Sequence, residues 1–266
     1  MEEKDILLFD EVASEVVLIR NRLFERFNNI NSCFLDQVLA NKIVLMQFYQ
    51  KEAKSFVSKF LELKRKSVKQ NELTSSELNI FRIFGVGETM HSYLISILLD
   101  PNGRHGQGHL FLNLFLDALR VKRFSENENW IVTAEIGRID ILLKRAHPHA
   151  VIVIENKSNF ASDQENQLYR YWYQEIHNAF VNSPLTDEYY QLIYLSPANW
   201  KKPIENSLLR PLNWDKNLPE IVPLKLKILL FEEFIVLWLQ KSLEKLPKEN
   251  HRIQEHVKQY LGIWNK

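Results

Sequence analysis

A pair of charged residues ends the most apolar segment of this sequence. Residues 150–157 read Ala-Val-Ile-Val-Ile-Glu-Asn-Lys, so Glu155 and Lys157 directly follow an aliphatic run typical of a buried strand. Side chains two residues apart on a strand point to the same face, so this pair is expected on one side of a sheet. Two interpretations follow from this segment alone: a salt bridge where the strand reaches the surface, or a charged pair kept for function.

A further acidic residue, Asp140, interrupts the preceding β-branched and aliphatic run, residues 138–144. A buried carboxylate is costly unless it is paired or bound to a metal. If the two strands are neighbours, Asp140 and Glu155 converge. Together with the backbone carbonyl of Asn156 they suit a hard cation such as Mg²⁺, with Mn²⁺ as a substitute. Lys157 beside such a site can orient or deprotonate a metal-bound water, or stabilise charge on a phosphoryl oxygen.

Asp140 followed by Glu155-x-Lys157 resembles the short motif of the PD-(D/E)XK nuclease superfamily, which has an Asp on one strand and Glu-x-Lys on the next. Gln167 and Tyr171 match the Gln-x-x-x-Tyr element of RecB-like members. The upstream segments are similar to an uncharacterised bacterial branch of the superfamily: Glu88-Thr-Met-His91-Ser92, Leu98-Leu-Asp-Pro101 and His105-Gly106. The resemblance covers about residues 78 to 264. The family's Pro before the Asp is absent, because Ile139 stands there.

The resemblance implies a site and a fold. Asp140 and Glu155 would be metal ligands, Glu88 would complete the metal shell, Lys157 would position the water, and Gln167 would contact the site or the phosphate. The implied fold is α/β, a restriction-endonuclease-like core in which helices flank a central mixed sheet in the order α-β-β-β-α-β. The implied activity is that of a Mg²⁺-dependent nuclease with DNA as the favoured substrate, and endonuclease and exonuclease cleavage both stay open.

A different class of function is kept beside this one. The chain can be a catalytically silent module with the nuclease fold that binds nucleic acid or a partner protein. The presence of every motif residue argues against it, because silent members of such families usually lose the Asp or the Lys. The sequence does not distinguish DNA from RNA or assign a pathway.

Several accessory residues remain open. His91 lies three positions after Glu88, on the same face of the expected helix, so His91 and its neighbour Ser92 either face the site or serve the core. The aromatic residues at positions 169, 171, 172 and 173 either stack on unpaired bases or fill the core. A zinc site at His105 and His109 is disfavoured, because the glycines around them predict a loop and no third ligand lies near.

The elements that must position these residues follow from hydrophobic periodicity. Strands are expected near 130–134, 138–144, 150–157 and 191–195, with a further one at 226–230, and the first three form a meander because the turns between them are short. Helices are expected at 89–99, 110–119, 163–180, 231–246 and 250–264. These elements form a nuclease-like domain over residues 76–266.

Residues 1–75 differ in character, with no Gly or Pro and with apolar residues at intervals of three or four. This pattern predicts long amphipathic helices, with an apparent turn at residues 28–32 next to Cys33. The segment is expected to be a helical N-terminal extension that serves as a homodimerisation surface or as a cap on the core.

Composition excludes several classes. The 34 Lys and Arg against 33 Asp and Glu give a net charge of +1, which excludes a uniformly basic nucleic-acid wrapper. No apolar run approaches the roughly 18 residues of a membrane span. One cysteine cannot form an internal disulfide, and the acidic first residues do not resemble a secretory signal, so a cytoplasmic location is expected.

Overall fold

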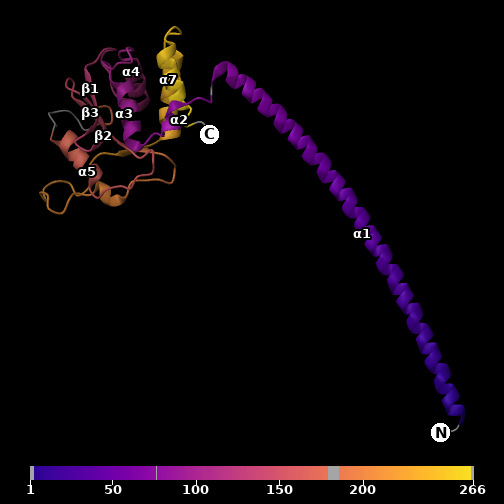
Figure 1. The fold of residues 1–266 in the computed structure, drawn as a ribbon. Helices are drawn as coiled ribbons and strands as arrows, with labels where there is room; N and C mark the ends of the chain where they lie inside the picture. Colours follow the sequence, from indigo (N-terminus) through magenta and orange to yellow (C-terminus); the bar gives the residue numbers. More distant parts are fainter. Residues whose placement is uncertain (1–2, 76, 179–185, 265–266) are drawn as a thin grey trace. The chain divides into compact units, whose positions relative to one another are not determined.

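The computed structural model describes residues 3–75, 77–178 and 186–264, with the side chains of the first helix described from Ser14 onward. The chain divides into two compact units, residues 1–78 and 79–266. The second unit contains the sheet and the helices that flank it (Figure 1).

The sheet has five strands in the order β1-β2-β3-β4-β5. The strands are β1 (Trp130–Ile136), β2 (Ile139–Arg145), β3 (Ala150–Asn156), β4 (Tyr190–Ser196) and β5 (Leu226–Leu230). The first three strands pair antiparallel, and β3, β4 and β5 pair parallel. The predicted meander and mixed sheet are therefore confirmed. Short turns suffice for the antiparallel pairs, whereas each parallel pair needs a long crossover connection.

The helices of this unit lie close to their predicted positions. They are α2 (Ile80–Phe84), α3 (Glu88–Leu99), α4 (Leu110–Leu119), α5 (Gln167–Tyr171), the π-helix η1 (Trp172–His177), the 3-10 helix η2 (Glu205–Leu208), the π-helix η3 (Phe231–Ile235), α6 (Val236–Lys245) and α7 (His251–Leu261). The helix predicted at 163–180 begins only at Gln167, because Asn166 adopts a left-handed φ of 56°. Residues 179 and 180 of that prediction lie outside the described residues.

The two faces of the sheet have separate hydrophobic cores. Ile152 and Ile154 of β3 belong to the core shared with α3, α4, α6 and α7. Val151 and Val153 point to the opposite face, where α5 and η1 pack. Because alternate residues of a strand face opposite sides, β3 is buried along its whole length. The end of this strand therefore carries Glu155 into the interior.

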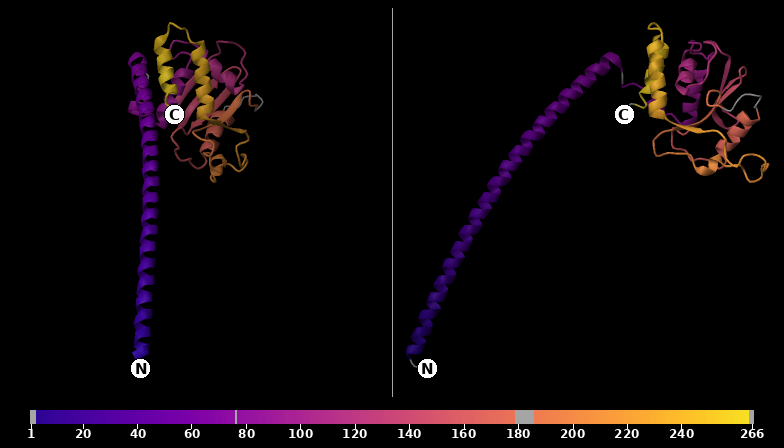
Figure 2. Two further views of the ribbon diagram at one scale, coloured as in Figure 1. Left: turned by 90° about the vertical axis from the view of Figure 1, so that its right-hand side faces the viewer. Right: turned by 180° about the vertical axis from the view of Figure 1, so that it is seen from behind.

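The first unit is one helix, α1 (Glu3–Thr74), of 72 residues, which Figure 2 shows as an uninterrupted ribbon. The turn predicted at residues 28–32 is wrong, because the helix continues through it. Asn and Ser each disfavour a helix by only about 0.5 kcal/mol, whereas Gly would weaken the helix and Pro would break it. Cys33 accordingly lies exposed on a helix.

Candidate active site

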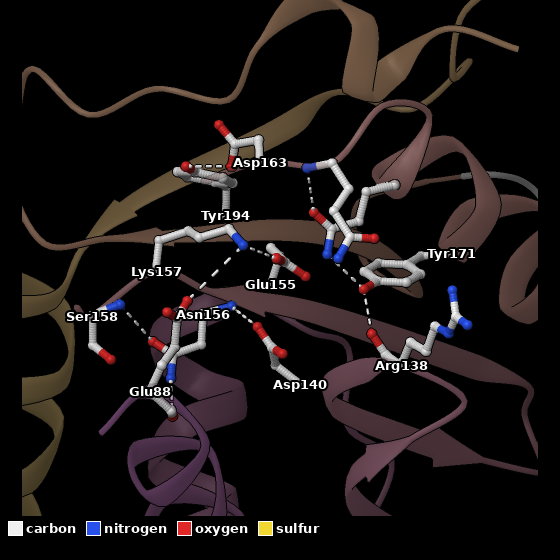
Figure 3. A network of polar contacts seen from close by, with 12 residues as sticks. Glu88, Arg138, Asp140, Glu155, Asn156, Lys157, Ser158, Asp163, Tyr171 and Tyr194 are labelled. Carbon is white, nitrogen blue, oxygen red and sulfur yellow. Dashed lines mark hydrogen bonds and ion pairs between the residues drawn. The ribbon is translucent and has the colours of Figure 1, made fainter. Parts of the chain in front are cut away.

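Two neighbouring strands bring the carboxylates of Asp140 and Glu155 to one face of the sheet. Strand β2 pairs with β3 so that Ile141 lies opposite Ile154, and one step further along this register Asp140 lies opposite Glu155. Opposite residues of an antiparallel pair share a face. Figure 3 shows both carboxylates, with Lys157 and Glu88, around a common region. A cavity of about 460 Å³ opens there.

Glu155 and Lys157 form a buried ion pair. Their side chains are 1% and 6% exposed, and Lys157 Nζ lies 2.5 Å from Glu155 Oε1. The interpretation of this pair as a surface salt bridge is therefore wrong. Beyond the ion pair, no group in the described part of the chain donates a hydrogen bond of ordinary geometry to the Glu155 carboxylate, although the nearby Tyr171 hydroxyl lowers its pKa. A buried carboxylate with an unsatisfied oxygen retains the capacity to bind a cation.

Asn156 connects the carboxylate strands to α3. Its backbone N–H donates to Asp140 Oδ2 at 2.6 Å. Its side-chain amide donates to the backbone oxygen of Glu88 and to Ser92 Oγ, both at 3.0 Å. Ser92 thus contacts Asn156 from α3 and holds the start of that helix against the end of β3. A metal-ligating role for the Asn156 carbonyl stays a prediction.

Glu88 is the first residue of α3, and its carboxylate lies 3.9 Å from Lys157 Nζ. The partial positive charge at a helix N-terminus favours an acidic side chain there. Gln167 and Tyr171 lie across the cavity on α5. Gln167 Nε2 donates to the Tyr171 hydroxyl at 2.8 Å, and that hydroxyl donates to the backbone oxygen of Arg138. Gln167 is thereby held at the cavity wall.

The acidic groups of the site raise one another's pKa values. Burial, followed by the charges of Asp140 and Glu135, raises the pKa of Glu88 to about 7, although Lys157 opposes this. Burial and the neighbouring Glu155 raise the pKa of Asp140, and burial raises that of Glu155. Burial acts to lower the pKa of Lys157, but the neighbouring Glu155 and Glu88 carboxylates raise that pKa overall. The cavity therefore gathers four acidic side chains, Glu88, Glu135, Asp140 and Glu155, with two basic ones, Arg138 and Lys157.

Glu135 was not among the predicted residues, yet it lines the same cavity. It lies on β1 between positions whose partners on β2 are Ile139 and Ile141, so it stands opposite Asp140. The signal available in the sequence was the tight turn at Gly137-Arg138, which fixes this register. The backbone of Glu135 has a φ of 57°, in the left-handed region that residues other than Gly rarely adopt.

The structure places His91 apart from the cavity. His91 Nδ1 lies 2.9 Å from the Tyr260 hydroxyl, and the imidazole is 2% exposed. Burial lowers its pKa to about 4, so the ring is neutral at pH 7. Of the two interpretations kept for His91, these contacts favour a role in the core, where it joins α3 to α7.

Of the two interpretations kept for the aromatic residues on the helix after the site, their burial favours core packing over a platform for bases. Tyr169, Tyr171 and Trp172 are all buried, and Tyr173 packs against Trp214 with ring centroids 4.5 Å apart. A different aromatic pair is exposed near the cavity. The rings of Phe160 and Trp200 stack at 5.2 Å with 14° between their planes. No local pattern in the sequence joins these two residues, which lie 40 positions apart.

The exposed pair borders the cavity through its chain neighbours. Phe160 donates its backbone N–H to the Lys157 oxygen at 3.0 Å, and Ala161 and Ser162 line the cavity. Next to Trp200, Lys201 Nζ lies 3.2 Å from Asp163 Oδ2. The two segments that carry the stacked rings are therefore linked by an ion pair.

Within the described residues, no three His, Cys, Asp or Glu side chains are already arranged around one point as metal ligands. At the candidate site the cause is visible, because Glu155 turns to Lys157 and Asp140 accepts from Asn156. His105 and His109 also have partners within the protein. His105 Nε2 contacts the backbone oxygen of Asp100, and His109 Nε2 contacts the backbone oxygen of Glu128.

The sequence profile of the PD-(D/E)XK nuclease superfamily matches residues 78–262, most of the chain. The protein therefore belongs to this superfamily, and the mixed sheet with its flanking helices is a restriction-endonuclease-like fold. No curated protein and no solved structure matches the chain. Among the described helices, none has both the length and the apolar character needed to cross a bilayer.

Proposed function

We propose that this protein is a metal-dependent nuclease that hydrolyses phosphodiester bonds, with DNA as the favoured substrate and Mg²⁺ or Mn²⁺ as the cofactor. The observation that carries the proposal is the buried Glu155 carboxylate, which keeps an unsatisfied oxygen beside Asp140 and Glu88 in an open cavity. Residues 76–266 are the proposed nuclease domain. The single cysteine of the chain, Cys33, favours a cytoplasmic location.

The donor set fits a hard divalent cation, because carboxylate oxygens are the ligands that Mg²⁺ prefers. Asp140 and Glu155 would hold the ion, Glu88 would complete its shell, and the Asn156 carbonyl is the remaining candidate ligand. Such an ion lowers the pKa of bound water and polarises a phosphoryl oxygen.

The chain's own groups then have separate roles. Lys157, whose ammonium lies beside Glu155 at the cavity, would donate to the attacking water or to a phosphate oxygen on which charge develops. Gln167, held by Tyr171, contacts the site or the phosphate from the opposite wall. Without a cation, the carboxylates of Glu88, Glu135, Asp140 and Glu155 repel a phosphate, so the proposal includes strict metal dependence.

The test uses purified protein with linear, supercoiled and single-stranded DNA and with RNA, each in Mg²⁺, Mn²⁺ and EDTA. Cleavage that requires the metal and disappears in Asp140→Ala and Lys157→Ala supports the proposal. If the wild-type protein cleaves none of these substrates faster than the two variants, the nuclease proposal is wrong.

A catalytically silent module that binds nucleic acid or a partner protein is the second candidate, because the internal ion pair already occupies Glu155. Calorimetric titration with Mg²⁺ and Mn²⁺ separates the two candidates. Metal binding that is lost in Asp140→Asn favours the nuclease, and no metal binding in the wild-type protein favours the silent module. We also propose that the chain forms a homodimer through α1.

A further inference from the structure

Helix α1 carries an apolar stripe with an 11-residue repeat. Three positions of the repeat are apolar in every copy from residue 16 to residue 60: Val16, Phe27, Val38, Tyr49 and Phe60; Leu23, Phe34, Leu45 and Phe56; and Phe24, Leu35, Met46 and Val57. Each of these side chains is between 45% and 71% exposed. Exposed apolar surface on this scale marks an interaction site.

The period decides what kind of surface covers the stripe. Eleven residues make three turns at 3.67 residues per turn, so these positions stay on one face of a nearly straight helix and favour a right-handed supercoil with another helix. The stripe from residue 16 to residue 60 is about 66 Å long at 1.5 Å per residue. Its partner must be a helix of similar length.

A second copy of α1 meets this requirement. Among the other helices in the described part of the chain, the longest is α3 with 12 residues, about 18 Å. Covering thirteen side chains at roughly 80 Å² each buries on the order of 1,000 Å² per copy, more than the ~800 Å² per partner of a stable interface.

Charge determines the orientation of the two copies. In an antiparallel register centred on Val38, residues 59–69, with five basic residues and one acidic residue, lie opposite residues 7–17, with three acidic residues and no basic one. A parallel pair would place like charges side by side, and an antiparallel pair places opposite charges together. The stripe permits the antiparallel arrangement, because about a centre near Val38 residue 16 lies opposite 60, 23 opposite 56, 27 opposite 49 and 34 opposite 45.

We propose that two copies of this protein associate through α1 as an antiparallel pair of helices joined along the 11-residue stripe. The inference goes beyond nuclease activity and gives the proposed homodimer its interface and orientation. It does not depend on the metal site, so either proposal can fail without the other.

The association is tested by light scattering of the full chain over a range of concentrations. The wild-type protein is expected at about twice its mass of 31.6 kDa. A variant with Phe34→Glu and Leu45→Glu on the stripe is expected at the single-chain mass. The matched control, Asn29→Glu and Gln47→Glu on the opposite face of the helix, is expected to stay dimeric. A single-chain mass for the wild-type protein, a larger assembly, or a stripe variant that stays dimeric would overturn the proposal.

Orientation is tested by disulfide formation in a Cys33→Ser background, which removes the natural cysteine. Chains with Leu23→Cys and chains with Phe56→Cys are oxidised separately and after mixing. An antiparallel pair gives linked dimers only in the mixture. Linked dimers of the Leu23→Cys chain alone indicate a parallel pair, and linked dimers in no sample contradict this register; either result overturns the proposed geometry. Metal-dependent cleavage by the same samples reports on the nuclease proposal separately.

Discussion

Helix α1 and the nuclease domain depart from ordinary surface chemistry in opposite directions. In α1, large apolar side chains such as Phe34 and Phe56 are exposed. In the domain, charged side chains such as Glu155 and Lys157 are buried. Buried charge and extended exposed apolar surface are the two observations that packing alone does not explain. Each therefore indicates binding: α1 carries an extended apolar surface, and the cavity gathers more acidic than basic side chains.

Variants at the cavity separate the two regions most sharply, because they should change the cleavage rate and leave the association through α1 unchanged. Asp140→Asn and Lys157→Met should each reduce metal-dependent cleavage by about 1,000-fold, because each removes a group that acts on the reacting phosphate or its metal. The mass of the assembly should not change. Initial rates and light scattering on the same samples measure both properties.

The stripe variant Phe34→Glu with Leu45→Glu is the reciprocal control, with single-chain mass and unchanged cleavage of a short oligonucleotide. If this variant loses cleavage as completely as Asp140→Asn, the two regions are not independent, and the comparison between them breaks down.

Acid should destabilise the domain through His91. Burial lowers the pKa of His91 to about 4 in the folded protein, whereas it is about 6.5 in an unfolded chain. Between these values the unfolded state binds more protons, so stability is complete above pH 6.5 and is lost as the pH falls toward 4. The loss can reach about 3 kcal/mol at 1.36 kcal/mol per pH unit.

Urea unfolding at pH 7.5, 5.5 and 4.5, followed by tryptophan fluorescence, measures this slope. His91→Phe should be less stable at pH 7.5, because Tyr260 loses its partner, but its stability should fall less steeply with acid. Equal slopes for the two proteins would contradict a neutral, buried His91. In α1, by contrast, the side chains described from Ser14 onward include no buried titratable group.

The sequence predicted the strands and the local motif well, because both depend on residues close together in the chain. The aliphatic run of β3 predicted a buried strand, and the two-residue spacing predicted that Glu155 and Lys157 share a face; both predictions required only the geometry of one strand. The prediction that Asp140 lies close to Glu155 required only that their two strands be neighbours joined by a short turn. The match of a superfamily profile to residues 78–262 confirms the family inferred from these residues.

What the sequence did not predict depends on tertiary contacts. Core packing and base stacking both stayed open for Tyr169 and Trp172, because their burial depends on distant residues, and the stacking of Phe160 on Trp200 joins two loops. The turn at residues 28–32 was wrong for a different reason. Asn and Ser are common in turns, but their helix propensity is lowered too little to stop a helix that continues on both sides.

The charge of Asp140 should destabilise the domain when no metal is bound. Burial and Glu155 raise its pKa, so the folded protein binds more protons than the unfolded chain between the two pKa values, and stability falls as the pH rises. Asp140→Asn removes this charge and can still accept the Asn156 N–H. In EDTA at pH 8, the free energy of unfolding of the variant should therefore be about 1–2 kcal/mol higher than that of the wild-type protein.

Added Mg²⁺ should raise the thermal midpoint of the wild-type protein and leave that of Asp140→Asn unchanged, because a ligand stabilises only the state that binds it. Lower stability of the variant in EDTA would show that Asp140 serves the fold and not a cation.

The smallest effect is expected at the stacked aromatic pair. Trp200 is 72% exposed, lies next to Lys201 and Lys202, and stacks on Phe160 at the border of the cavity. Aromatic platforms contribute about 1–3 kcal/mol per unpaired base, and at the lower end of this range Trp200→Ala should weaken binding of single-stranded DNA by roughly 5-fold and binding of blunt duplex less. Fluorescence anisotropy in the Asp140→Asn background, where cleavage is removed, measures both affinities.

Leu212→Ala is the matched control for that measurement, because Leu212 is 98% exposed but is neither aromatic nor among the residues that line the cavity. Equal losses for single-stranded and duplex DNA would mean that Trp200 does not read unpaired bases. An unequal loss would extend the comparison between the two regions. Exposed apolar side chains in α1 would then serve a second copy of the protein, and those beside the cavity would serve the substrate.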